Sequence, residues 1–264
     1  MLAMSPSVTT DLSCDRLRPM PLESVEKLVA EELDSVIRYG MALGFTVRPR
    51  TVLVEGTTDV ELFELAARLH YKALGVNLLG NELAIVAAGE RDRGGTHGVI
   101  RELIALRGMA RTCLSQNGSP RYRFVGLFDN DRAGKQAVKL ARDIDTSMLE
   151  YKDVFRLWPV MPLPGILEPG AVQRAFDNEN SLYKGLEWEL EDLLSQEFVE
   201  AFIAYCPMAI SHTSSLAGKV HRDFTRDGKA RFHRFIKQHA MLADLHAVID
   251  TLQAIRFYLN LPQH

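Results

Sequence analysis

Hydrophobic and polar residues alternate along the chain between short apolar runs and longer stretches with helical spacing. Runs of β-favouring residues predict four strands, over 51–55, 83–88, 121–128 and 154–160. Apolar positions three and four residues apart predict helices over 22–44, 58–72, 97–114 and 132–145. Because strands and helices alternate with short connections, we expect an α/β fold with a central, mostly parallel four-stranded sheet flanked by helices.

The pattern changes at both ends of this region. Residues 1–20 have weak periodicity and several prolines, which predicts a loose arm. After about residue 165 the strand signal fades, and the spacing predicts helices over 186–202 and 229–259. We therefore expect three parts: an N-terminal arm and helix over 1–47, an α/β core over 48–165, and a helical C-terminal subdomain over 166–264.

Composition narrows the class of protein. The chain has 264 residues, of which 47% are hydrophobic, and a net charge of −3. This charge argues against a protein that binds nucleic acid over its whole surface, but it is compatible with a local basic face. Cys14, Cys113 and Cys206 lie far apart and form no CxxC pair, which favours a reducing compartment over a structural zinc site. The sequence shows no signal peptide and no long apolar run, so we expect a cytoplasmic protein without membrane contact.

Candidate chemistry lies where two of the predicted strands end. Glu55 and Asp59 follow the first strand, and Asp129 and Asp131 follow the third. The carboxyl ends of parallel strands gather at one edge of a sheet, where ligands bind, so these four acids are expected to converge. Carboxylate oxygens suit Mg²⁺ or Mn²⁺, and a cation would relieve their mutual repulsion. Taken alone, the Asp129 and Asp131 pair is also compatible with a turn that caps the following helix.

The order and context of these acids resemble the Toprim domain. A strand ending in Glu55-Gly56, with Asp59 opening a helix, is followed by a strand ending in Asp129-x-Asp131 and a second helix. DNA primases, topoisomerases, recombination mediators and OLD-family nucleases share this domain, which covers roughly residues 48–165 here. The resemblance implies a Rossmann-like sheet. Asp59, four residues after Glu55, resembles the OLD type more than the primase type.

The OLD resemblance implies further site residues. The stretch from Glu187 to Leu194 is similar to the motif in which an acid precedes an Asp-Leu-Leu helix, so Glu191 and Glu189 become candidate metal ligands. Glu189 departs from the small hydroxyl residue that the family often has there, and an exposed acidic helix face is the alternative. A lysine that reaches the site is implied as well, with Lys229 as the candidate and Lys219 as its rival.

Basic residues beside the acids are candidates for gripping a phosphate backbone, with a solvated surface as the alternative. They are Arg91, Arg93, Arg132 and Lys135. The chain contains no GxxxxGK[ST] phosphate-binding loop, and its histidines have no HExxH spacing.

The resemblance therefore implies a nucleic-acid endonuclease that uses Mg²⁺ or Mn²⁺, with two ions in a two-metal scheme. In that scheme Glu55, Asp59, Asp129, Asp131 and Lys229 carry the catalysis. Glu55 as a general acid or base is a second option, implied by the primase and topoisomerase branch.

Full-length OLD proteins carry an ATPase domain before their Toprim domain, and we expect no room for one in these 264 residues. The chain is similar to stand-alone Toprim subunits of two-component anti-phage systems, which implies a defence effector that docks on a separate ATPase subunit or on a second copy of itself. The other interpretation is a Toprim module that binds DNA, RNA or a nucleotide in recombination or repair without cutting.

Overall fold

The computed structural model describes residues 34–88 and 94–263, and the chain from Ser35 onward forms one compact unit. The expected N-terminal arm, most of the expected helix over 22–44, and both Arg91 and Arg93 lie outside the described residues.

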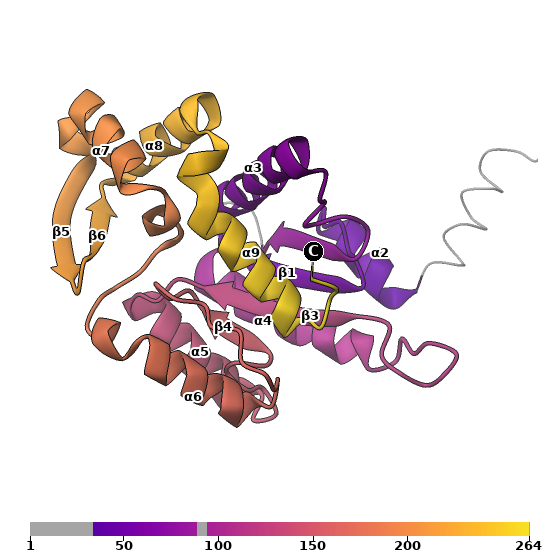
Figure 1. Cartoon of the computed structure of the whole chain (residues 1–264). Coiled ribbons are helices and arrows are strands. Elements are labelled where there is room, and N and C mark those ends of the chain that lie inside the picture. The colour runs from indigo at the N-terminus through magenta and orange to yellow at the C-terminus, as the bar shows by residue number, and fades with distance from the viewer. Residues whose placement is uncertain (1–33, 89–93, 264) are drawn as a thin grey trace, which may run out of the picture. The chain divides into compact units, whose positions relative to one another are not determined.

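A four-stranded parallel sheet forms the centre of this unit, in the order β2-β1-β3-β4 (Figure 1). The strands are β1 (Arg50–Val54), β2 (Leu83–Ala87), β3 (Arg123–Phe128) and β4 (Val154–Arg156). Val52 of β1 is in register with Ile85 of β2 and with Val125 of β3, and all three strand pairs are parallel. The predicted α/β fold and its four parallel strands are confirmed. The last strand is shorter than expected because Pro159, which has no N–H to donate to a ladder, follows soon after it.

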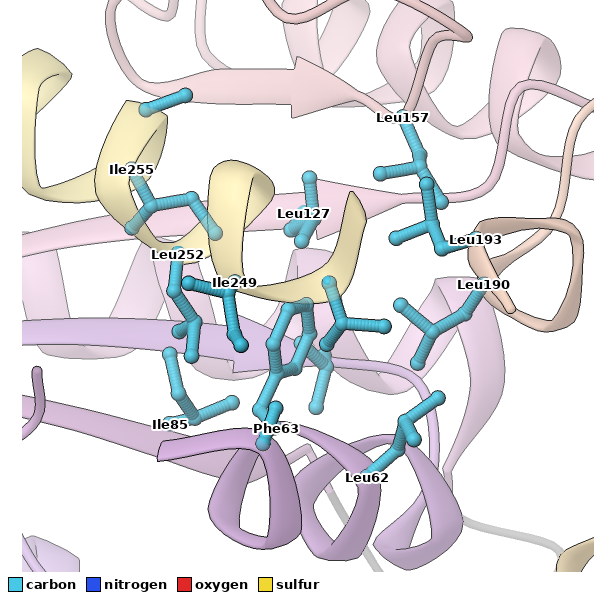
Figure 2. Close-up of a cluster of buried hydrophobic side chains, with 14 of the residues drawn as sticks. Leu62, Phe63, Ile85, Leu127, Leu157, Leu190, Leu193, Ile249, Leu252 and Ile255 are labelled. Atoms are coloured by element: carbon cyan, nitrogen blue, oxygen red, sulfur yellow. The ribbon is translucent and has the colours of Figure 1, made fainter. Parts of the chain in front are cut away.

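Side chains alternate between the two faces of the sheet, and helices cover both faces. Leu53, Val86 and Phe124 pack with α2 (Ser35–Ala42), α4 (Gly95–Ala110) and α5 (Arg132–Ile144). Val52, Ile85 and Leu127 point to the opposite face, where they pack with α3 (Thr57–Leu74) and α9 (His246–Tyr258). Figure 2 shows Ile85 and Leu127 in this packing. The near-continuous apolar runs seen in the sequence are those of strands buried on both sides.

The C-terminal part is mostly helical, as predicted, and packs on the same core as the sheet. Its helices are α6 (Pro169–Glu179), α7 (Gln196–Tyr205), α8 (Arg226–His239) and α9. Short 3₁₀ turns join them: η2 (Ser181–Tyr183), η3 (Leu190–Leu193), η4 (Pro207–Ala209) and η5 (Leu242–Leu245). Among all the described residues, no helix is both long enough and apolar enough to cross a membrane.

Local caps divide the two long helices expected here. In place of one helix over 186–202, η3 ends at Leu193 and α7 begins after Ser195, whose hydroxyl accepts the N–H of Phe198. In place of one helix over 229–259, α8 begins after Thr225, and η5 separates it from α9. The sequence predicted single helices because the apolar spacing continues across these breaks. It continues because η3 and α7, like α8 and α9, each turn an apolar side to the same core.

A two-stranded antiparallel hairpin, β5 (Ile210–Leu216) and β6 (Lys219–Phe224), was not expected from the sequence. Its turn is Ala217-Gly218, and both residues have positive φ, as a type I′ turn requires. Phe224 of the hairpin packs against Phe202 of α7 and Phe232 of α8, with ring centroids 6.3 Å and 4.8 Å away. This aromatic packing ties the hairpin to the start of α8, which carries Lys229.

Candidate acidic metal site

The end of β1 supplies the first two acids of the site. Glu55 follows the strand directly, and its backbone carbonyl accepts the N–H of Gly95 at 3.1 Å. Asp59 lies in the first turn of α3, where its Oδ2 accepts the N–H of Gly56 at 2.9 Å. Asp59 therefore caps the helix with one oxygen, which holds its carboxylate beside Glu55 and close to the strand end.

The end of β3 supplies the second pair. Asp131 is the N-cap of α5, and its Oδ1 accepts the N–H of Gly134 at 2.6 Å. Asp129 Oδ1 accepts the N–H of Leu190 at 3.1 Å, a bond that crosses to the C-terminal part of the chain. Gly134 is required for this arrangement because a Cβ there would overlap the carbonyl oxygen of Asp129. The helix-capping interpretation thus holds for Asp131, while Asp129 faces the turn η3.

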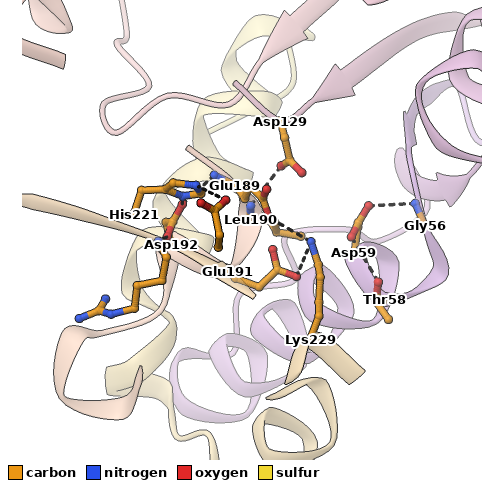
Figure 3. Close-up of polar contacts among 12 residues, drawn as sticks. Gly56, Thr58, Asp59, Asp129, Glu189, Leu190, Glu191, Asp192, His221 and Lys229 are labelled. Atoms are coloured by element: carbon orange, nitrogen blue, oxygen red, sulfur yellow. Dashed lines mark hydrogen bonds and ion pairs between the residues drawn. The ribbon is translucent and has the colours of Figure 1, made fainter. Parts of the chain in front are cut away.

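Turn η3 brings in the acids that the resemblance implied. Glu191 is 2% exposed, and its Oε1 accepts from Lys229 Nζ at 3.0 Å and from His233 Nε2 at 2.9 Å. Glu189 Oε2 also accepts from Lys229, at 3.1 Å. Lys219 points elsewhere: its Nζ lies 5.7 Å from the centre of the Trp188 ring. Lys229 is therefore the lysine that contacts these acids (Figure 3).

A buried support holds η3 in place. Asp192 accepts the N–H of Glu189 at 2.8 Å and the Nδ1 of His221 at 2.6 Å. The Asp192 carboxylate raises the pKa of His221 to about 9, despite the opposing effect of burial. A charged His221 therefore anchors the turn that carries Glu189 and Glu191 to strand β6.

We name the acidic cluster by its six members: Glu55, Asp59, Asp129, Asp131, Glu189 and Glu191. Burial, followed by the charges of Asp59 and Asp131, raises the pKa of Glu55 to about 7. Burial and the nearby Glu191, Asp59 and Glu55 raise the pKa of Asp129 well above its ordinary value. Burial, then the charge of Glu191, raises the pKa of Asp59 as well. Glu55, Asp59 and Asp129 line one small cavity together with Leu190 of η3, so these acids lie close to one another and to the turn that carries Glu189 and Glu191.

The cation of Lys229 distinguishes Glu191 from the other acids. Burial alone would raise the pKa of Glu191, but the hydrogen bond from His233 and the charge of Lys229 lower it to about 2. In return, the charges of Glu191, Glu189 and Asp129 raise the pKa of Lys229, although burial opposes them. Glu191 and Lys229 are thus a charged pair, whereas the pKa values of Glu55, Asp59 and Asp129 stay raised although the charge of Lys229 lowers each of them.

The residues of the acidic cluster have the chemistry of a divalent-cation site, although not the spacing of one. Lys229 pairs with Glu189 and Glu191, and within the described residues Glu191 Oε2 is buried without a hydrogen-bond partner. A hard cation would satisfy this orphan oxygen and remove the repulsion that raises the pKa of Glu55 and Asp129. In the described chain, however, three ligand atoms within 4.8 Å of one another occur in Glu187, His221 and Asp223, and in no trio of the acidic cluster. Binding an ion in the acidic cluster therefore requires its carboxylates to move closer together.

Two of the four basic side chains predicted beside the site, Arg132 and Lys135, are described, and both lie close to it in the chain. Arg132 and Lys135 are exposed in the first turns of α5, immediately after Asp131. Arg156, which sequence reasoning missed, donates to Asn130 Oδ1 at 2.7 Å, between the two aspartates, and to Glu150 at 2.7 Å. His233 was also missed, although its position four residues after Lys229 on one helix face was a usable signal.

Comparison of the chain with models of known families, with characterised proteins and with solved structures gives no match.

Proposed function

We propose that this chain is an endonuclease that hydrolyses phosphodiester bonds of nucleic acid with Mg²⁺ or Mn²⁺, as OLD-like Toprim nucleases do. The observation that carries the proposal is the convergence of the acidic cluster from β1, β3 and η3 around Lys229. Glu191 is buried and the other five acids are half-buried, and proteins rarely gather so many carboxyl groups in this way unless a cation or a function compensates for the desolvation and repulsion.

Each part of the cluster has a role in such chemistry. Divalent cations bound there would activate the attacking water and neutralise charge on the phosphate. Glu55, Asp129 and Asp131 would hold the ions from the strand ends, and Asp59, Glu189 and Glu191 would complete the ligand set.

Two groups of the chain can act directly on the substrate. As the alternative to holding an ion, the Glu55 carboxyl, with a pKa of about 7 in the metal-free protein, can exchange a proton near neutral pH, as a general acid or base must. Lys229 remains charged, and its 36% exposed side chain can approach a phosphate while holding Glu191.

The test is cleavage of plasmid DNA and of tRNA by the purified protein with Mg²⁺, Mn²⁺ or EDTA. We expect cleavage that needs the metal and that Glu55→Gln and Asp129→Asn each abolish. Glu64→Gln, which removes an exposed acid of α3 away from the cluster, is the matched control and should cleave like the wild type. Cleavage that persists in Asp129→Asn would exclude the acidic cluster as the catalytic site, and absence of cleavage of either substrate with either metal would reject the nuclease.

A second candidate, a nucleic-acid- or nucleotide-binding module without catalysis, is favoured by one observation. Protein donors already engage five of the six acids: Gly56 on Asp59, Leu190 on Asp129, Gly134 on Asp131, and Lys229 on Glu189 and Glu191. Such a module would bind its ligand equally well in EDTA and would show no Mn²⁺ binding by calorimetry. Mn²⁺ binding that Asp129→Asn removes would favour the nuclease instead.

A further inference from the structure

A basic groove runs along α5, beside the acidic cluster. It is a cavity of about 470 Å³ lined by residues of α5, by Glu150 and by Arg156 at the end of β4. Lys135, Lys139 and Arg142 supply its cations from α5, and all three are exposed. Their spacing of four and three residues places them on one side of the helix. We call this feature the α5 groove.

The α5 groove carries uncompensated positive charge. Arg156 is paired with Glu150 at 2.7 Å, whereas no ion pair within the described residues involves the three cations of α5. Four cations and the two acids Asp143 and Glu150 line the groove, which leaves a net charge of +2 (4 − 2) in a chain whose net charge is −3. Basic side chains that are exposed, aligned and unpaired suit a polyanion.

One end of the groove lies about one helical turn from the acidic cluster. Asp131 caps the helix whose side forms the groove, and Lys135 lies one turn further on. Arg156 reaches from the groove to Asn130, the residue between Asp129 and Asp131. A strand that leaves the acidic cluster along α5 therefore meets Lys135 first, then Lys139 and Arg142.

The lining also indicates which form of nucleic acid fits. No aromatic ring is among the described residues that line the α5 groove, and its uncharged members are Val138 and Thr146. Proteins that hold single strands combine cations with aromatic rings on which bases stack, whereas a duplex presents its phosphates outward. From Lys135 to Arg142 the helix rises about 10 Å, at 1.5 Å per residue. Along the axis of a duplex, successive phosphates of one strand are about 3.4 Å apart, so an α5 that lay parallel to this axis would span roughly three of them.

We infer that the α5 groove binds one sugar–phosphate backbone of a nucleic-acid duplex and aligns that strand with the acidic cluster. The inference rests on the proposed nucleic-acid function and adds to it the substrate class, a duplex held through its phosphates without sequence readout. It assigns Lys139 and Arg142, in addition to Lys135, to backbone contacts.

The test measures binding in EDTA, so that cleavage plays no part. Fluorescence anisotropy of a labelled mixed-sequence duplex, and of one of its single strands, is followed over a series of KCl concentrations. We expect the full chain to bind the duplex more tightly than the single strand. Replacing Lys135, Lys139 and Arg142 together by Gln should weaken duplex binding at least ~10-fold and reduce the slope of log K against log [KCl] by about 2 to 3, close to one unit per lost phosphate contact.

The matched control removes equal charge elsewhere. Arg68 and Lys72 are exposed one turn apart on α3, and Lys184 is exposed after η2. Replacing these three by Gln should leave the slope unchanged, and circular dichroism melts of both triple variants check that each is folded. If the α5 variant is misfolded, single Gln substitutions at Lys139 and Arg142 should each lower the slope by about 1.

Three results would overturn the inference: an unchanged slope in the α5 variants, an equal loss in the control, or preference of the wild type for the single strand. Its failure is separable from that of the nuclease. Binding that depends on the groove without any cleavage rejects the nuclease and keeps the groove. Cleavage that the α5 substitutions leave intact rejects the groove and keeps the nuclease.

Discussion

Replacing Glu55 by Gln should stabilise the metal-free protein while reducing its stabilisation by Mg²⁺. Burial and the charges of Asp59 and Asp131 raise the pKa of Glu55 from 4.5 to about 7. The folded state therefore binds more protons than the unfolded state between these values, and its stability falls as pH rises through this window. At 1.36 kcal/mol per pKa unit, a shift of this size makes ionised Glu55 destabilising by about 3 kcal/mol above pH 7.

Glutamine keeps the shape and the acceptor oxygen of the side chain but carries no charge. The increase in the free energy of unfolding caused by Glu55→Gln should therefore be complete above pH 7 and decline as pH falls. It should vanish below about pH 4.5, where Glu55 is protonated in the folded and the unfolded state. At 2–4 °C per kcal/mol for a unit of this size, the melting temperature should rise by about 6–12 °C.

Stabilisation by Mg²⁺ should change in the opposite direction, with the wild type gaining more than Glu55→Gln. A ligand that binds only the folded state stabilises it by about 2.7 kcal/mol at a concentration of 100 Kd. Wild-type protein should gain stability as MgCl₂ is titrated, and Glu55→Gln should gain much less because a ligand is missing.

The assay is thermal unfolding by circular dichroism at several pH values, with EDTA or MgCl₂, beside Glu64→Gln as the control. The reasoning is refuted if Glu55→Gln is no more stable than Glu64→Gln above pH 7, or if its gain persists unchanged at low pH. Either result would mean that the charge of Glu55 is not held against its neighbours in the folded protein.

Two further substitutions test the framework of the site. Gly134→Ala places a Cβ against the carbonyl oxygen of Asp129, so urea unfolding should show a loss of about 1–3 kcal/mol or more. Gly108→Ala on α4 meets no atom within 4 Å and should gain up to about 1 kcal/mol; equal effects at both sites would contradict the close approach. Lys229→Met leaves Glu191 buried with His233 alone, which should cost about 1–3 kcal/mol in the same assay, since Lys229 is partly exposed. No loss of stability in Lys229→Met would show that the pair does not hold η3.

Much of the fold could be predicted because its signals are local. The alternation that buries Val52 and Leu53 on opposite faces, and the short connections between strands and helices, are written into neighbouring residues. The hairpin could not be found in this way. Its strands are mostly polar, as in Ser211-His212-Thr213, and Ala217-Gly218 lacks the Asn-Gly or Asp-Gly signature of a type I′ turn.

The order of strands and helices along the chain is enough to place Glu55 and Asp129 at the ends of neighbouring strands, because parallel strands bring their carboxyl ends to one edge of the sheet. The groups that face these two acids are known only from the folded chain. The bond from Leu190 to Asp129 and the contacts of Glu191 with Lys229 and His233 join segments about 40 to 60 residues apart. Such contacts depend on how a capped turn and a helix start pack on the sheet, and residue spacing carries no record of that packing.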